Sequence, residues 1–352
     1  AGVVIDPQDG EVLALASVPS YDPNGFILGF SDKDRAALRS ETQRPLLSRA
    51  AQGAYPTGSA FKPITFVAGM EGLGYTADTV LDCPSTFQLE GASQTWEDWT
   101  VAYNLPAQGP QTLHQALVNS CNTVFYGIGR DLDLKDPDLL PNMAKAFGLG
   151  APTGIPYLPE VSGVAPSPEW KLENLGDYWA TGDAVNLAIG QGFLQVTPLQ
   201  LANAYAAIAN GGHVLQPYIV STLIDANGQQ EQVGTRVVRN ELPVSQETLQ
   251  ALQAAMHDQT SDPNANGSFR VFGDMPFPIA GKTGTAQRND SATAKPHSWF
   301  GSFGPYGEQA ELATAVMYES AGEGVSFAAP ATRRIYEAWL QSPLRTATAP
   351  TG

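Results

Sequence analysis

Three short motifs combine residues that could perform nucleophilic chemistry. In chain order they are Ser59-Ala60-Phe61-Lys62, Ser120-Cys121-Asn122 and Lys282-Thr283-Gly284. A serine hydroxyl is a weak nucleophile unless a base lies beside it. A serine and a lysine three positions apart at the start of a helix lie on one face, within reach of each other. The first motif therefore predicts Ser59 as a nucleophile and Lys62 as its base.

The other two motifs supply what such a pair needs. A lysine acts as a base only when its pKa is lowered, and burial or a second nearby cation lowers it. Lys282 is the candidate for that second cation. We expect Ser120 to relay a proton and Asn122 to bind an amide of the substrate.

The third motif also suggests how a substrate is held. The backbone N–H groups of Ser59 and Thr285 are the expected donors to an oxyanion. Gly284 would let an extended peptide lie close to its strand and add to the edge of a sheet.

Each motif has a simpler explanation when taken alone. A serine followed by a lysine three residues later is common by chance, and Ser120 with Asn122 fits a polar helix face. Lys282 and Thr283 suggest a phosphate-binding loop, but the first glycine of such a loop would fall at position 276, which is Pro276. Three motifs in order, each in a suitable element, favour one joint site.

Five segments have the apolar, β-prone composition of strands. Two of them, Ala1–Asp6 and Glu11–Val18, flank a turn rich in Pro, Asp and Gly and predict a hairpin. Three more lie late in the chain: Ile279–Gln287, Ser298–Phe303 and Glu311–Glu319. Together they predict one five-stranded antiparallel sheet, covered by a terminal helix over Ala329–Leu340 and by helices from the middle of the chain.

The remaining elements predict a helical half. Pro56-Thr57-Gly58-Ser59 precedes apolar residues spaced by three, and Pro63 falls in the first turn, where a missing N–H matters least. Thr197-Pro198 opens another helix, which runs to Ile208. Further helices are predicted over Asp32–Ser40, Thr112–Gly129 and Glu247–Asp258, and strands over Val214–Ile224 and Glu231–Val238. We expect one α+β domain over residues 1–352.

Composition narrows the function classes. The 352 residues include 35 Asp and Glu against 19 Lys and Arg, for a net charge of −16, and 43% are hydrophobic. This balance argues against a nucleic-acid binder and against disorder. No apolar run is long enough to span a membrane. The chain starts at Ala1 directly in a predicted strand, so we expect a piece of a longer protein with any signal or anchor upstream.

Taken together, the motifs and their surroundings resemble the transpeptidase domain of class B penicillin-binding proteins, most of all the elongation-type (rod-shape) branch. The similarity runs over nearly the whole chain. Besides the three motifs it includes the opening hairpin, Pro19-Ser20-Tyr21-Asp22-Pro23-Asn24, Arg49-Ala50, Tyr55-Pro56-Thr57-Gly58, Gly190-Gln191-Gly192, Thr197-Pro198-Leu199-Gln200, His297-Ser298-Trp299-Phe300 and Ala328-Ala329-Pro330.

The resemblance implies a penicillin-binding/serine β-lactamase-like fold and D,D-transpeptidation of peptidoglycan stem peptides that end in D-Ala-D-Ala. It also implies acylation by β-lactam antibiotics, no cofactor, and a donor carboxylate held by Lys282, Thr283 and Thr285. The implied partner is a membrane glycosyltransferase of the elongation machinery. The implied location is the extracytoplasmic face of the cytoplasmic membrane, with an N-terminal anchor and a pedestal domain absent from this chain.

Two departures from that branch concern the second motif and its surroundings. Asn122 stands where the branch often has Asp, a change that should not disturb the role. Some members carry a zinc site whose positions fall here at Cys83, Asp98, Gln108 and Cys121. Gln108 is a poor zinc ligand, so we expect no metal. A disulfide, favoured by an oxidising compartment, and two reduced buried thiols both remain open for the cysteines.

Related activities compete with the transpeptidase interpretation. A β-lactamase needs a carboxylate that activates water for deacylation, and Glu173-Asn174-Leu175 does not match the expected E-x-x-L-N element. A D,D-carboxypeptidase and a β-lactam-sensing module share the three motifs, so both remain alternatives.

Overall fold

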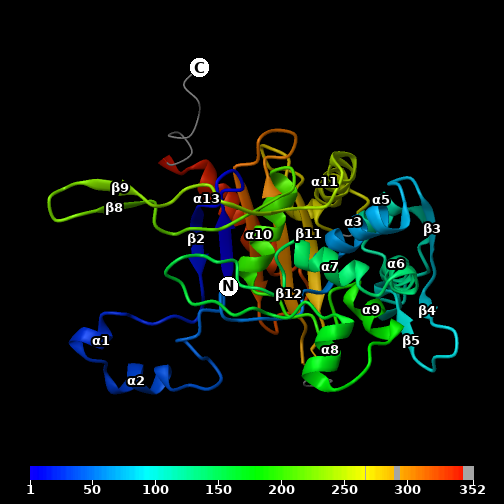
Figure 1. Cartoon of the computed structure of the whole chain (residues 1–352), viewed down its shortest axis with the longest axis horizontal. Helices are drawn as coiled ribbons and strands as arrows, with labels where there is room; N and C mark the ends of the chain where they lie inside the picture. Colours follow the sequence, from blue (N-terminus) through cyan, green and yellow to red (C-terminus); the bar gives the residue numbers. More distant parts are fainter. Residues whose placement is uncertain (266, 289–293, 344–352) are drawn as a thin grey trace.

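A five-stranded antiparallel sheet forms the centre of the computed structural model, which describes residues 1–265, 267–288 and 294–343 (Figure 1). The strands follow the spatial order β11 (Ala280–Ala286), β12 (His297–Gly304), β13 (Leu312–Tyr318), β1 (Gly2–Ile5) and β2 (Val12–Ala16). The first strand pairs with the last, with Val4 opposite Thr314. The predicted sheet and α+β class are confirmed, and β11, which carries the third motif, is an edge strand.

Helices bury both faces of this sheet. Successive side chains of a strand point to opposite faces. Val3 and Ile5 accordingly join the core that α10 (Pro198–Ala209) covers, while Val4 joins the smaller core under α13 (Ala328–Leu340). Helix α10 begins at Pro198 after the N-cap Thr197, as the sequence predicted. The structure adds a capping box between Thr197 and Gln200.

The helical half packs beside β11. It carries the first and second motifs, whereas β11 carries the third. Its main helices are α3 (Lys62–Leu73), α5 (Leu113–Val118), α6 (Asn122–Lys135), α7 (Leu139–Ala146), α8 (Pro168–Leu175) and α9 (Thr181–Leu187). Helix α11 (Gln246–Ser261) contacts β11, α3 and α5, so it joins the sheet to the helical half.

One predicted helix, Thr112–Gly129, is wrong as a continuous element. Thr112 ends strand β6 (Gly109–Thr112), α5 stops at Val118, and α6 starts only at Asn122. The reason is a turn between the helices, in which Ser120 has a φ of 56°. A non-glycine residue adopts this left-handed conformation rarely, and a helix cannot continue through it.

The predicted strands Val214–Ile224 and Glu231–Val238 are also wrong in extent. Four short strands replace them: β7 (His213–Leu215), β8 (Thr222–Ile224), β9 (Gln230–Gln232) and β10 (Val238–Glu241). Pro217 separates β7 from β8, because proline cannot donate to a strand ladder. Strands β8 and β9 form a hairpin that projects from the body (Figure 1).

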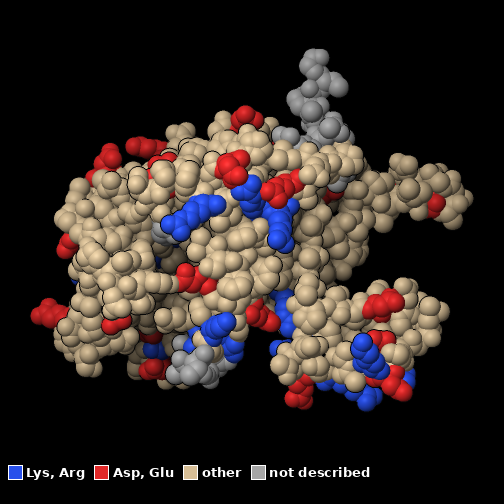
Figure 2. Space-filling model, turned by 180° about the vertical axis from the view of Figure 1, so that it is seen from behind, with Lys and Arg blue, Asp and Glu red and all other residues tan. Residues whose placement is uncertain are grey.

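Several short elements have no counterpart in the sequence prediction. They are α1 (Gly25–Leu28), β3 (Val80–Cys83), β4 (Thr86–Gln88), β5 (Thr95–Glu97), α4 (Trp99–Ala102) and α12 (Phe269–Phe272). Helices α1 and α2 (Asp32–Leu38) lie in a lobe that stands apart from the sheet (Figure 1). No helix in the described ranges is long and apolar enough to cross a membrane. Acidic and basic side chains are interspersed over the face in Figure 2.

Candidate active site

Ser59 lies in a tight turn that rests on the edge strand of the sheet. The turn is the 3-10 helix η1 (Gly58–Phe61), which leads into α3. Gly58 has a φ of 56°, and a Cβ there would come within 2.5 Å of the Thr285 carbonyl oxygen. Only glycine satisfies both the conformation and the close approach. The turn that carries Ser59 is therefore packed directly on β11, the strand that carries the third motif.

Further contacts hold this turn from both sides. The Gly58 N–H donates to the Gly190 carbonyl oxygen at 2.9 Å. The Trp299 indole N–H donates to the Pro56 carbonyl oxygen at 3.0 Å. A Cβ on Gly284 would lie 2.4 Å from the Thr57 carbonyl oxygen, so Gly284 has a packing role beside the one expected at the strand edge.

Lys62 is completely buried and points at the second motif. Its Nζ lies 2.7 Å from both the Ser120 carbonyl oxygen and Asn122 Oδ1, 3.2 Å from the Cys121 carbonyl oxygen and 3.3 Å from Ser120 Oγ. Burial lowers the pKa of Lys62 to about 7, although the charge of Asp98 acts in the opposite direction. The expected lowering of the Lys62 pKa is thus present, and burial is its main cause.

Lys282 approaches the same hydroxyl from the sheet. It is also completely buried, and its Nζ donates to Ser120 Oγ at 2.9 Å. Burial lowers the pKa of Lys282 well below its ordinary value, and the nearby charge of Lys62 lowers it further. Ser120 therefore stands between two buried amines, and the three motifs form one site.

The turn between α5 and α6 is what brings Ser120 to this place. Next to it, the Asn122 N–H donates to Asp98 Oδ2 at 2.7 Å. Cys121 is joined to Cys83 at the end of β3 by a disulfide bond, which resolves the alternative left open for the cysteines. A covalent bond and a charged hydrogen bond thus fix the residues that follow Ser120.

The residues around this disulfide do not fit a zinc site as they stand. Cys83, Asp98 and Cys121 offer ligand atoms within 4.8 Å of one another. Zinc binds thiolates, however, and both sulfurs are committed to the disulfide. Gln108 occupies the fourth position and donates its Nε2 to Asp98 Oδ1 at 3.2 Å.

The groups expected to face a substrate differ in exposure. Ser59 is half-buried, Thr283 is buried and Thr285 is exposed. Thr285 Oγ1 accepts a hydrogen bond from the Gly324 N–H at 3.3 Å. The Asn122 amide nitrogen donates to the Glu97 carbonyl oxygen at 3.3 Å. Contacts of these residues with a substrate remain predictions.

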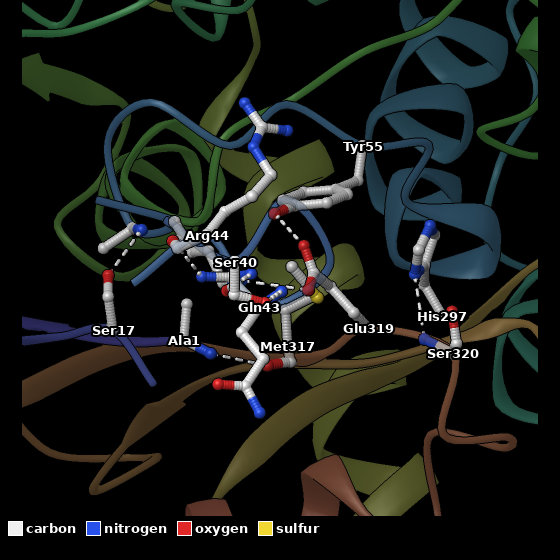
Figure 3. A network of polar contacts seen from close by, with 12 residues as sticks. Ala1, Ser17, Ser40, Gln43, Arg44, Tyr55, His297, Met317, Glu319 and Ser320 are labelled. Atoms are coloured by element: carbon white, nitrogen blue, oxygen red, sulfur yellow. Dashed lines mark hydrogen bonds and ion pairs between the residues drawn. The ribbon is translucent and has the colours of Figure 1, made fainter. Parts of the chain in front are cut away.

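Sequence reasoning missed a polar network that supports the nucleophile turn (Figure 3). Tyr55 donates its hydroxyl to Glu319 Oε1 at 2.5 Å, and the buried Arg49 donates Nε to Glu319 Oε2 at 2.9 Å. Arg49 also donates to the carbonyl oxygens of Gln43 and Arg44. Arg49 and Tyr55 lie in segments that carry the family resemblance. The sequence therefore marked both residues, but it did not indicate that they bind Glu319. Gln259, which contacts Lys282, carried no such signal.

The family model of the penicillin-binding protein transpeptidase domain matches residues 1–337. The chain belongs to this family. It is 33% identical to the peptidoglycan D,D-transpeptidase MrdA of Haemophilus influenzae over 98% of this chain and 53% of that protein. It is also 33% identical to the peptidoglycan D,D-transpeptidase PbpA of Mycolicibacterium smegmatis, over 96% of this chain and 66% of that protein. These relatives place it in the elongation-type branch.

Solved structures confirm the fold of the family. The PBP2 of Pseudomonas aeruginosa in complex with WCK 5153 has a TM-score of 0.84 and 31% identity, and the match covers 97% of this chain and 74% of that one. The ceftriaxone acyl-enzyme complex of penicillin-binding protein A from M. tuberculosis has a TM-score of 0.80 and 30% identity, over 96% and 73% of the two chains. The chain spans about half the length of the MrdA relatives it matches.

Proposed function

We propose that this chain is the D,D-transpeptidase domain of a peptidoglycan synthase and that it works through an acyl-enzyme on Ser59. The observation that carries the proposal is the buried array in which the Ser120 hydroxyl lies between Lys62 and Lys282. A nucleophilic serine needs a neighbouring base, and two amines forced close together in a buried site provide one.

In the first half-reaction, the Ser59 O–H bond breaks as its proton passes to Lys62 Nζ. The oxygen forms a bond to the carbonyl carbon of the penultimate D-Ala of a donor stem peptide. The N–H groups of Ser59 and Thr285 stabilise the oxyanion. The C–N bond to the terminal D-Ala then breaks, and the leaving amine takes up a proton relayed through Ser120.

In the second half-reaction, a neutral amine of a neighbouring stem peptide forms a C–N bond to the acyl carbon and gives up a proton to Lys62 Nζ. The C–O bond to Ser59 breaks, and the Ser59 oxygen takes a proton back from Lys62. Lys282, Thr283 and Thr285 hold the terminal carboxylate of the donor before it leaves, and Asn122 binds an amide of the donor. A β-lactam enters as a mimic of the donor and acylates Ser59 in the same way.

The names of relatives support the substrate and partner classes. MrdA and PbpA are named peptidoglycan D,D-transpeptidases, and penicillin-binding protein A of M. tuberculosis has been solved as a penicillin G acyl-enzyme. One matching structure is described as a peptidoglycan synthase complex that coordinates polymerization and crosslinking. The PBP2 of Helicobacter pylori has been solved with MreC. We therefore propose a membrane glycosyltransferase partner, an extracytoplasmic location, and an anchor and pedestal outside residues 1–352.

The test is a transfer assay with a synthetic stem peptide ending in D-Ala-D-Ala and a labelled amine acceptor. We expect mass spectrometry to find D-Ala release matched by acceptor incorporation, both lost in Ser59→Ala. The exposed Ser31→Ala, on the separate lobe, is the matched control.

The outcomes separate the related functions. Release of D-Ala without incorporation would identify a D,D-carboxypeptidase. Acylation by penicillin with neither product would identify a β-lactam-sensing module.

A further inference from the structure

The two buried lysines raise the question of which one carries a proton. Both amines donate a hydrogen bond to the Ser120 hydroxyl. The Nζ–Oγ distance is 3.3 Å for Lys62 and 2.9 Å for Lys282. Two like charges this close in a buried site do not both ionise easily, so the protons belong to the pair rather than to either residue. Lys62 accepts the Ser59 proton only when it is itself neutral, so as long as the pair holds one proton, that proton must be on Lys282.

The surroundings of Lys62 favour the opposite arrangement. Two backbone carbonyl oxygens and Asn122 Oδ1 accept from its Nζ within 3.2 Å. The charge of Asp98 also favours the protonated form of Lys62. If Lys62 is the base, a group next to Lys282 must stabilise the protonated form of Lys282 and so offset these contacts.

Gln259, in the last turn of α11, lies in that position. Its side chain is completely buried between the Gly281 carbonyl oxygen and Lys282 Nζ. In the amide orientation that satisfies both neighbours, its nitrogen donates to Gly281 at 2.7 Å and its oxygen accepts from Lys282 at 2.8 Å. The next residue, Thr260, donates its hydroxyl to the Ile279 carbonyl oxygen. The amide oxygen is therefore held against the lysine by contacts on both sides.

We propose that Gln259 is a positioning residue that keeps Lys282 as the charged member of the pair, so that Lys62 stays free to accept the Ser59 proton. A hydrogen bond is stronger when its donor is an ammonium group, so the amide oxygen favours the charged form of Lys282. The inference rests on the proposed acyl-transfer function and adds a residue from outside the three motifs to that site.

The other charged groups near the pair do not supply this effect. Lys62 faces Lys282 from α3, and its charge lowers the pKa of Lys282. The charge of Asp98 raises the pKa of Lys62 and so favours a proton on Lys62. On α11, Asp258 lies beside Gln259, but its carboxylate pairs with His114 at 2.8 Å. The residue opposite Lys282 on β12 is Gly301, which has no side chain.

The test compares the pH dependence of acylation by a fluorescent penicillin in the wild type and in Gln259→Met, which keeps the length of the side chain and removes the amide. We expect the acidic limb of the variant to move to higher pH by about one unit, because the remaining proton moves to Lys62. The rate at pH 7 should fall roughly tenfold and recover toward the wild-type rate at high pH.

Gln253→Met is the matched control. Gln253 is on the same helix, but its amide donates to the Ile208 carbonyl oxygen at 2.6 Å and so ties α11 to α10. The midpoint of its pH profile should match that of the wild type.

An unshifted midpoint in Gln259→Met, with or without a uniform loss of rate, would overturn the inference, because a merely structural role lowers the rate at all pH values. The melting temperature of each variant shows whether it is folded. If Gln259→Met does not fold, Gln259→Asn, whose amide is one methylene too short for Lys282, should show the same shift. If penicillin does not acylate the wild type at all, the proposed acyl-transfer function is wrong, and the inference about Gln259 fails with it.

Discussion

Burial lowers the pKa of the Lys62 amine, which we propose as the base. We expect Lys62→Ala to slow acylation by penicillin by about a hundredfold or more, the usual contribution of a general base. The measurement is the rate of fluorescent-penicillin labelling. The control is Lys135→Ala, which should label at the wild-type rate. Lys135 is the last residue of α6, and its Nζ donates to the Gly72 carbonyl oxygen of α3. Near-normal labelling of Lys62→Ala would assign the base to another group.

The pKa of Lys62 also predicts the pH dependence of the wild-type enzyme. A lysine whose pKa is lowered to about 7 is increasingly neutral as the pH rises through that value, and only the neutral amine accepts a proton. The acylation rate should therefore increase from pH 6 to pH 8. A rate that rises only above pH 9 would show that Lys62 stays charged in the free enzyme and that burial does not lower its pKa.

At the scale of elements, the disulfide fixes the turn that carries Ser120. It joins β3 to the start of α6 across 38 residues of sequence. Reduction should lower the free energy of unfolding by about 2–4 kcal/mol, typical of such a bond. It should also slow acylation, because Cys121 lies between Ser120 and Asn122. Urea unfolding with and without reductant measures the first effect, and labelling measures the second.

A thiol titration in denaturant provides the control for the disulfide. Without reductant, we expect no free thiol in the unfolded chain. Two reactive thiols per chain, or identical unfolding curves in the presence and absence of reductant, would be incompatible with the Cys83–Cys121 bond.

Elements with one strong local signal were predicted well, whereas elements set by distant contacts were not. The five strands have regular apolar patterns, and α10 has both an apolar pattern and a clear N-cap. All of these elements occur where expected. The break at Ser120 was missed because the apolar spacing continues on both sides of it, while the turn depends on backbone conformation and on the distant residues Asp98 and Cys83. Gln259 was missed because one glutamine on a glutamine-rich helix has no distinguishing local pattern.

At the scale of the whole molecule, β1 and β13, the first and last strands in sequence, pair within the sheet, and the residue that follows β13 reaches the segment before the nucleophile turn. Glu319 follows β13 and accepts from Arg49 and Tyr55 (Figure 3). Glu319→Ala should lower the free energy of unfolding by roughly 1–3 kcal/mol, the cost of leaving a buried donor without a partner. Urea denaturation measures this change. The exposed Glu308→Ala should leave the free energy of unfolding unchanged. Equal effects of the two substitutions would show that the contacts of Glu319 with Arg49 and Tyr55 do not stabilise the fold.

The three motifs come together only in the complete fold, since Ser59, Ser120 and Lys282 lie on separate elements. Their identity could be predicted from local sequence because each motif is short and ordered along the chain. Their mutual contacts could not, because these depend on how α11, β11 and the α5–α6 turn pack. The family match over residues 1–337 agrees with a site that needs nearly the whole chain.

The most direct measurement is mass spectrometry of the intact protein over time after exposure to a labelled penicillin. We predict one adduct per chain that persists for hours, because the carboxylate beside the lysine pair, Asp98, is occupied by the N–H groups of Asn122 and Thr100. Cleavage after Phe61 separates Ser59 from Ser120, and the adduct should lie on the Ser59 peptide and be lost in Ser59→Ala. An adduct on another residue, or rapid release of hydrolysed penicillin, would contradict the assignment of Ser59 as the nucleophile of a transpeptidase.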